Sequence, residues 1–265
     1  MGLYQNRIVV KVGTSTLTNE LGQSDLRSFD RLACVLADIQ NQGYEVILVS
    51  SGAIAVGRSK LHLPHKPETL RLKQAAAAVG QCSIMFLYDK FFHDYDKTIA
   101  QILLNAEDMQ NEEKKENLVN TFNTLLEMHI LPVVNENDSV SYTEIESEEK
   151  LFGDNDMLSA VVAVLCQAQK LVILSDIDGL YDHDPRLYSQ AKLISRITTI
   201  DEQVLKLAGG AGSRRGRGGM RTKLQAAQLA TGQGIDTVIL NGKNPAALYD
   251  LIQGRTAGTL FIGQH

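Results

Sequence analysis

Cysteine is scarce in this sequence: the 265 residues include three, and none stands at the short spacing of a metal-binding motif. A sparse, odd set of cysteines is typical of a reducing compartment, so we expect a cytoplasmic protein. Cys34 and Cys166 lie in apolar helical patterns, and we expect both to pack as small hydrophobic residues.

Long apolar runs and an excess of basic residues are also missing. No run is long enough to span a bilayer, and residues 1–11 hold no apolar segment of the signal-peptide type. The formal net charge of −5 argues against non-specific binding to nucleic acid. We therefore expect neither a membrane nor a nucleic-acid partner. Hydrophobic residues make up 44% of the chain, enough for a sizeable core, and no repeat or low-complexity linker divides it.

Strand and helix signals alternate along the chain. Strands that are apolar throughout and alternate with helices indicate a parallel sheet covered on both faces, which is an α/β fold. We expect strands at 7–12, 45–49, 98–104, 130–134, 170–174 and 237–240, and a short edge strand at 259–262. We expect helices at 25–40, 68–92, 107–128 and 220–231, and another that starts near Asp156.

Polar segments follow four of the predicted strands, at residues 11–15, 50–53, 135–138 and 175–179. Any one of them could be ordinary turn chemistry, because Gly, Ser, Asn and Asp are common turn formers. In a parallel sheet, however, ligands bind at the carboxyl ends of the strands. Four polar segments in such positions favour a shared active site.

Lys11 lies inside an otherwise apolar strand, where a charge is costly unless an anion pairs with it. A phosphate group is one such partner; the alternative is a lysine that snorkels to solvent at the strand end. Gly13 and Gly52 would let the backbone approach a ligand closely. Ser51, with the N–H groups of Gly52 and Ala53, could hold a carboxylate or phosphate at a helix start.

Amide and carboxylate side chains supply both hydrogen-bond donors and acceptors, which suits a substrate with ammonium and carboxylate groups. The candidates are Asn135, Asn137, Asp138 and Asn155. Residues 154–156 open an apolar helix, where the helix dipole favours bound anions. Read alone, they are equally well an ordinary N-cap with an acidic first turn.

A glycine-rich, basic segment at 209–219 precedes a helix that opens with Met220, Arg221, Thr222 and Lys223. Small residues and free N–H groups can wrap a polyphosphate, and Lys223 could reach a phosphoryl group in transfer. The segment is neither a Walker A loop nor the dinucleotide fingerprint. A flexible loop is one alternative. An RNA-binding segment is another, disfavoured by the acidic chain and the lack of interleaved aromatic residues.

Several segments in order over nearly the whole chain resemble the amino acid kinase family. The lysine–glycine element at 10–14 is shared across that family, whereas the elements at 51–55 and 135–138 favour its glutamate 5-kinase branch. The matching segments are 10–14, 49–57, 77–81, 134–138, 152–156, 179–181, 184–186, 218–220 and 222–223.

The resemblance implies a three-layer αβα sandwich around an eight-stranded, mainly parallel open sheet. It implies transfer of the γ-phosphoryl group of ATP to the side-chain carboxylate of L-glutamate, giving L-glutamyl 5-phosphate in the first step of proline biosynthesis. Magnesium would bridge the phosphates, and Asp156 would align the catalytic lysines, Lys11 and Lys223, rather than act as a base. The predicted glutamate-binding residues are Ser51, Gly52, Ala53, Asn135, Asp138 and Asn155. The predicted ATP-binding residues are Lys11, Gly13, Ser175, Asp176, Arg217, Gly218, Gly219, Met220, Arg221, Thr222 and Lys223.

We expect a single amino acid kinase domain over residues 1–265, with a glutamate-binding lobe at about 1–168 and an ATP-binding lobe at about 169–265. Many family members add a C-terminal PUA module, and this sequence resembles the form without one. The family also suggests a homotetramer or dimer and feedback inhibition by L-proline. Departures from the family pattern are the long acidic loop at 139–151 and two arginines, Arg217 and Arg221, where small polar residues are expected.

Two other functions remain open from the sequence. A sister kinase would phosphorylate N-acetylglutamate, aspartate or a nucleotide, but Asp138 suits an acceptor with a free amine. A non-catalytic amino-acid sensor on the same scaffold would have little need of Lys11, Asp156 and Lys223.

Overall fold

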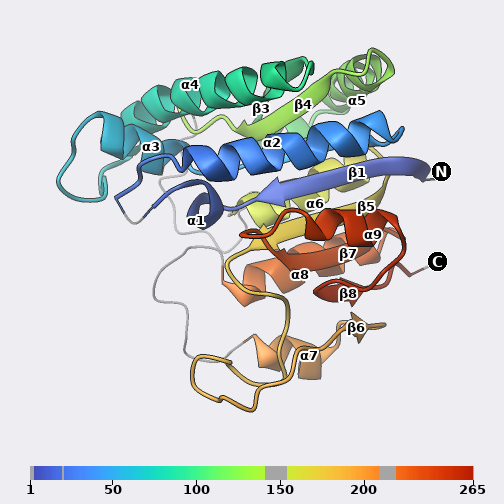
Figure 1. Ribbon diagram of the computed structural model, residues 1–265. Coiled ribbons are helices and arrows are strands. Elements are labelled where there is room, and N and C mark those ends of the chain that lie inside the picture. The colour runs from blue at the N-terminus through green and yellow to red at the C-terminus, as the bar shows by residue number, and fades with distance from the viewer. Residues whose placement is uncertain (1–2, 20, 141–153, 209–218, 265) are drawn as a thin grey trace.

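The computed structural model describes residues 3–19, 21–140, 154–208 and 219–264, and Figure 1 shows a sheet with helices on both sides. The sheet has eight strands in the order β3-β4-β2-β1-β5-β7-β8-β6, and every pairing is parallel except that of β7 with β8. The predicted α/β class, with its mainly parallel eight-stranded open sheet, is therefore confirmed.

The strands are β1 (Tyr4–Val12), β2 (Glu45–Ser50), β3 (Ile99–Leu104), β4 (Leu131–Glu136), β5 (Ala168–Ser175), β6 (Arg196–Ile197), β7 (Asp236–Asn241) and β8 (Thr259–Phe261). The helices are α1 (Thr14–Leu17), α2 (Leu26–Asn41), α3 (Ala53–Lys60), α4 (Leu70–Asp94), the 3-10 turn η1 (Ala106–Met109), α5 (Glu112–Glu127), α6 (Asn155–Leu165), α7 (Glu202–Leu207), α8 (Met220–Thr231) and α9 (Ala247–Ile252).

Two hydrophobic clusters lie on opposite faces of the sheet, because successive side chains of a strand point to opposite faces. Val9 of β1 packs in the cluster that contains α5, α6 and α8. Its neighbour Val10 packs in the cluster that contains α2, α3, α4 and α9. Lys11 is two residues from Val9 and therefore faces α6. No helix in the described part of the chain is long and apolar enough to span a bilayer.

The last strand was wrongly predicted as an edge strand. β8 lies between β7 and β6, and it is β6 that forms the edge. β6 has two residues, too few to show a periodic signal. The predicted helix at 107–128 is also divided: η1 ends at Met109, and Asn111 caps α5 by accepting a hydrogen bond from the Lys114 N–H. Sequence reasoning did not identify the short helices α1, α7 and α9, and of α3 it predicted only the start, at Gly52 and Ala53.

The two cysteines expected to be buried differ. Cys166 is buried at the end of α6, as predicted. Cys34 is exposed, so its predicted packing in the core is wrong. It lies on α2, whose buried face is formed by neighbours such as Ala33 and Leu36. The apolar run around Cys34 therefore identifies the helix but not the direction of every side chain.

Candidate active site

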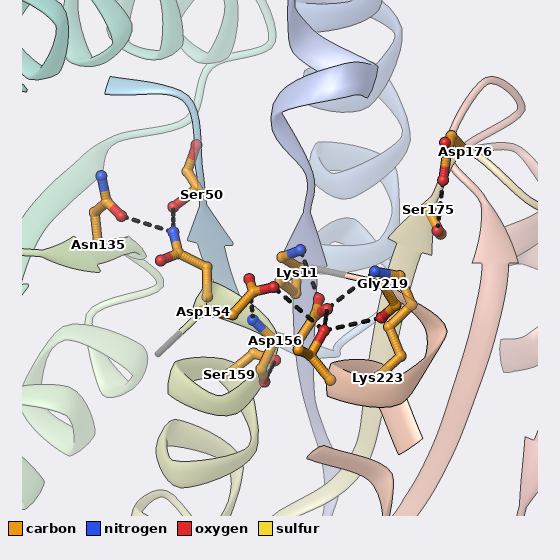
Figure 2. Close-up of polar contacts among 12 residues, drawn as sticks. Lys11, Ser50, Asn135, Asp154, Asp156, Ser159, Ser175, Asp176, Gly219 and Lys223 are labelled. Carbon is orange, nitrogen blue, oxygen red and sulfur yellow. Dashed lines mark hydrogen bonds and ion pairs between the residues drawn. The ribbon is translucent and has the colours of Figure 1, made fainter. Parts of the chain in front are cut away.

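The carboxyl ends of the central strands lie level with one another. Val12 of β1 pairs with Ser50 of β2 on one side and with Leu174 of β5 on the other. The polar segments that follow these strands consequently meet at one edge of the sheet, as the sequence predicted. The N-terminus of α6 lies at this same edge and brings Asp156 under the end of β1 (Figure 2).

Asp156 lies between two lysines from distant parts of the chain. Its Oδ1 is 2.6 Å from Lys11 Nζ, and its Oδ2 is 2.9 Å from Lys223 Nζ (Figure 2). Asp156 is fully buried, and the two lysines are 4% and 6% exposed. Lys11 therefore pairs inside the protein, which rules out the solvent-snorkelling alternative. Two cations and one anion leave the cluster with a net positive charge, which suits an anionic ligand.

The ionisation of Asp156 is controlled by opposing effects. Burial alone would raise the pKa of this carboxyl group, but the ammonium groups of Lys11 and Lys223 outweigh burial and lower the pKa below its ordinary value. Asp156 is therefore a carboxylate at neutral pH. Both of its oxygens contact a lysine, so the carboxylate fixes the positions of the two ammonium groups.

The N-termini of α6 and α8 are joined through Thr222. The Thr222 hydroxyl lies 2.9 Å from Asp156 Oδ2 and 3.2 Å from Asp154 Oδ2, and also 2.9 Å from the Gly219 carbonyl oxygen. Gly219 caps α8 without a side-chain hydrogen bond to the first-turn N–H groups. Gly219 has no side chain to compete with an anion for these N–H groups, and the helix dipole favours an anion there.

Asp154 confirms the capping interpretation of the 154–156 segment. It is the N-cap of α6, with its side chain accepting a hydrogen bond from the Asp156 N–H. It also faces Thr222 across the site. One residue therefore both caps α6 and contacts the N-terminal turn of α8.

The predicted ATP-binding residues fall in three places. Ser175 is buried at the end of β5 and donates to the Asp176 carboxylate over 3.2 Å, whereas Asp176 itself is exposed (Figure 2). Gly13 follows β1 directly and caps α1. Gly219, Met220, Arg221, Thr222 and Lys223 open α8, with Arg221 exposed. Arg217 and Gly218 lie outside the described residues.

The predicted glutamate-binding residues gather on the other side of Asp156. Asn155 donates to the Ser50 carbonyl and, over 2.8 Å, to Asn135 Oδ1. Gly52 caps α3 with φ of +105°, a left-handed conformation that favours glycine and lets the chain turn sharply from Ser51 into Ala53. Ala53 and Asp138 line a cavity of about 440 Å³.

Gln81 is a site residue that sequence reasoning did not single out. It accepts a hydrogen bond from Asn135 over 2.8 Å and lines the same cavity as Asp138. The available signal was its place in the 77–81 segment that resembles the family. The acidic loop at 139–151 lies outside the described residues from 141 onward.

Two solved kinase structures have a fold similar to that of this chain. The fold resembles that of a carbamate kinase from Giardia lamblia bound to AMP-PNP, with a TM-score of 0.68 and 15% identity over 97% of this chain and 98% of that one. It also resembles a UMP kinase from Ureaplasma parvum, with a TM-score of 0.65 and 16% identity over 98% of this chain and all of that one. At these identities the likeness defines the fold alone.

The family model for the amino acid kinase family matches residues 6–241. A glutamate 5-kinase from Clostridium perfringens is 53% identical over 97% of this chain and 96% of its own length. One from Enterococcus faecalis is 46% identical over 97% of this chain and 94% of its own length. The chain therefore belongs to the amino acid kinase family, within its group of glutamate 5-kinases.

Proposed function

We propose that this protein transfers the γ-phosphoryl group of ATP to the side-chain carboxylate of L-glutamate, forming L-glutamyl 5-phosphate, the first step of proline biosynthesis. The observation that carries the proposal is the buried cluster of Lys11, Asp156 and Lys223. It lies where the N-termini of α6 and α8 meet, between the amide side chains and the end of β5. Similarity to the glutamate 5-kinases supports the choice of acceptor.

The reaction needs positioning and charge stabilisation more than a base. The γ-carboxylate of glutamate is already ionised at neutral pH, so there is no proton to remove from the nucleophile. The obstacle is repulsion between that carboxylate and the nucleotide phosphates. Lys11 and Lys223 would stabilise the charge on the phosphoryl group in transfer, and Asp156 would hold the two ammonium groups in place.

The nucleotide would bind on the α8 side of the cluster. Its phosphates suit the N–H groups at the start of α8, which the N-cap Gly219 leaves without a side-chain hydrogen bond, and Ser175 and Asp176 would bind another part of the nucleotide. Among the described residues there is no group of three or more His, Cys, Asp or Glu side chains that could hold a metal. Mg²⁺ would instead enter bound to the phosphates of ATP, because this ion usually binds substrate phosphates rather than a site built only from protein ligands.

Glutamate would bind on the opposite side, in a lobe made by about residues 1–168, with the nucleotide in a lobe from about 169 to the C-terminus. Ser51 and the N–H groups of Gly52 and Ala53 would hold a carboxylate. Asn135, Asp138 and Asn155 would bind the α-amino acid end.

The direct test is ADP release from Mg-ATP over a panel of acceptors. We expect the greatest kcat/KM with L-glutamate, and far lower values with L-aspartate and N-acetyl-L-glutamate. An acceptor profile led by N-acetyl-L-glutamate or UMP would contradict the proposal, and ADP release independent of any acceptor would leave no carboxylate transfer to explain.

The Asp138→Ala variant should mainly raise the KM for glutamate, because it removes a carboxylate from the wall of the cavity where the ammonium group would bind. We expect KM to rise about 10- to 100-fold, the range for losing a hydrogen bond to a charged group. The KM for ATP should remain near its wild-type value. Initial rates with each substrate varied in turn measure both constants; an equal rise in the two would contradict this role.

L-Proline should inhibit the enzyme in competition with glutamate. Proline carries the same α-carboxylate and a cationic amine, so it could use part of the surface formed by Ser51, Asp138 and Asn155. It lacks the γ-carboxylate and cannot accept a phosphoryl group. Initial rates at several glutamate concentrations, with and without millimolar proline, provide the measurement. Inhibition that saturating glutamate does not relieve would show that the two ligands bind different surfaces.

The protein should assemble as a homodimer or homotetramer. Leu72, Val79 and Phe86 recur every seven residues on α4 and are 45%, 37% and 67% exposed, so they form an apolar stripe on one face of a long helix. We expect Phe86→Glu to lower the molecular mass measured by light scattering after gel filtration. Leu187→Glu is the matched control, since Leu187 is 69% exposed away from α4. A wild-type monomer would contradict the assignment.

A further inference from the structure

A chain of side-chain amides leads away from the lysine cluster. Asn155 Nδ2 donates both to the Ser50 carbonyl oxygen and to Asn135 Oδ1, the latter over 2.8 Å. Asn135, which is 3% exposed, in turn donates from Nδ2 to Gln81 Oε1 over 2.8 Å. The relay thus connects α6, β4 and α4, in that order.

The direction of every hydrogen bond in this relay is determined by its first member. A backbone carbonyl can only accept, so the Asn155 atom near Ser50 must be the NH₂ nitrogen. That same nitrogen faces Asn135, which must present its oxygen and therefore turns its own NH₂ group toward Gln81. Gln81 must accept with Oε1, and its Nε2 remains available as a donor.

The backbone around Gln81 is held tightly. Gly80 packs so closely against the first turn of α3 that a Cβ at this position would overlap the carbonyl oxygen of Ala53. This contact keeps α4 at a fixed distance from the start of α3. Gln81 lines the cavity that Ala53 and Asp138 also line, and no described residue accepts a hydrogen bond from its Nε2.

The cavity has carboxylates but no cation. Its lining includes Glu136 and Asp138, and neither Lys nor Arg is among the lining residues that the structure describes. An amino acid bound there would find acceptors for its ammonium group, whereas its α-carboxylate would need neutral donors. Gln81 offers such a donor, with its polarity fixed by the relay.

We propose that Gln81 is a specificity-determining residue that donates from Nε2 to the α-carboxylate of the amino acid substrate. The inference rests on the proposed glutamate kinase activity. The γ-carboxylate must approach Lys11 and Lys223 for transfer, so the α-carbon end points along the relay toward the cavity. The preference for substrates with a free α-carboxylate then comes from the hydrogen bond that Gln81 Nε2 donates.

The Gln81→Glu variant tests the hydrogen-bond donor of the side chain separately from its acceptor. The introduced carboxylate keeps an oxygen that accepts from Asn135, so the relay is preserved, but the donor is replaced by an acceptor. Gln101→Glu is the matched control. Gln101 lines the same cavity, and its substitution by glutamate adds the same negative charge outside the relay. Melting temperatures and the KM for ATP establish that both variants are folded and bind the nucleotide.

The acceptors to compare are L-glutamate and L-glutamate α-amide, which keeps the amine and the γ-carboxylate but has a neutral amide in place of the α-carboxylate. Kinetic analysis gives the KM of each acceptor, or the Ki of the α-amide if it only competes. With Gln81→Glu we expect the glutamate KM to rise about 10- to 100-fold. The KM or Ki of the α-amide should change little, since its NH₂ group can donate to the new carboxylate. Gln101→Glu should leave the preference for glutamate over the α-amide within about 3-fold of the wild-type value.

Two results would overturn the inference without touching the proposed function. Equal weakening of glutamate and its α-amide by Gln81→Glu would mean that the Gln81 donor does not distinguish an α-carboxylate from an amide. An equal loss of preference in Gln101→Glu would mean that any added charge in the cavity has this effect. Absence of ADP release by the wild-type enzyme with glutamate would instead refute the proposed function itself.

Discussion

Lys223→Ala should lower kcat by about 10²- to 10³-fold, the range for losing one preorganised charge partner of a transition state. Lys11→Ala should do the same. Each variant leaves Asp156 paired with one remaining lysine, so the buried carboxylate keeps a partner and the fold should survive. The loss should appear in kcat more than in KM, because the two lysines would stabilise charge that develops in the transition state.

Lys170→Ala provides a matched control for both lysine variants. Lys170 lies on β5, at the amino end of the sheet, where its Nζ is 3.9 Å from Asp236. Removing its charge should leave kcat within about 2-fold of the wild-type value, because a partly exposed ion pair far from the site contributes little. Steady-state kinetics on the three variants, with urea unfolding as a check on folding, make the comparison. Unchanged kcat in Lys11→Ala or Lys223→Ala would contradict their catalytic role.

Asp156→Asn should damage both catalysis and stability. The amide keeps the shape of the side chain but leaves two buried ammonium groups without their anion. Removing one member of a buried ion pair typically costs about 3–5 kcal/mol, so we expect a loss of roughly 3 kcal/mol in the free energy of unfolding at pH 7. We also expect kcat to fall about 10²-fold, since neither lysine is then held at the phosphoryl group.

The contribution of Asp156 to the free energy of unfolding should depend on pH in a direction that its pKa determines. The pKa of Asp156 is lower in the folded protein than in the unfolded chain, because the two ammonium groups outweigh the effect of burial. The carboxylate therefore stabilises the fold above its unfolded pKa of about 3.9, and this contribution is lost as the pH falls through the lower, folded value. Urea unfolding should show a constant difference between wild type and Asp156→Asn from about pH 5 to 8, and a shrinking difference below about pH 4.

The pH–rate profile distinguishes alignment from base catalysis. If Asp156 aligns the lysines, the residual kcat of Asp156→Asn should depend on pH as the wild-type kcat does above about pH 5, where the wild-type carboxylate stays ionised. A wild-type acid limb above about pH 5 that the variant lacks would assign the proton-accepting role to Asp156 instead, because a general base titrates near the working pH. The contacts of both carboxylate oxygens with lysines favour alignment.

The sequence by itself determined the fold class, the order of the longer helices and the strands of the sheet centre. The apolar runs around Val9 and around Val172 are each long enough to indicate a buried strand, and polar residues follow both at their carboxyl ends. The sequence also contained Lys11, Asp156 and Lys223 as candidates, since charged residues at strand ends and helix starts are visible without coordinates.

Only the tertiary structure decided which of these residues meet. Lys223 and Asp156 are 67 residues apart, and Gln81 and Asn135 are 54 apart, so no local pattern pairs them. Such contacts depend on how α4, α6 and α8 pack around the sheet, which is a matter of long-range burial. For the same reason the place of β8 inside the sheet could not be predicted, because long-range packing determines which strands pair with it. One of these strands, β6, forms the edge beyond β8 and is too short to be recognised from the sequence.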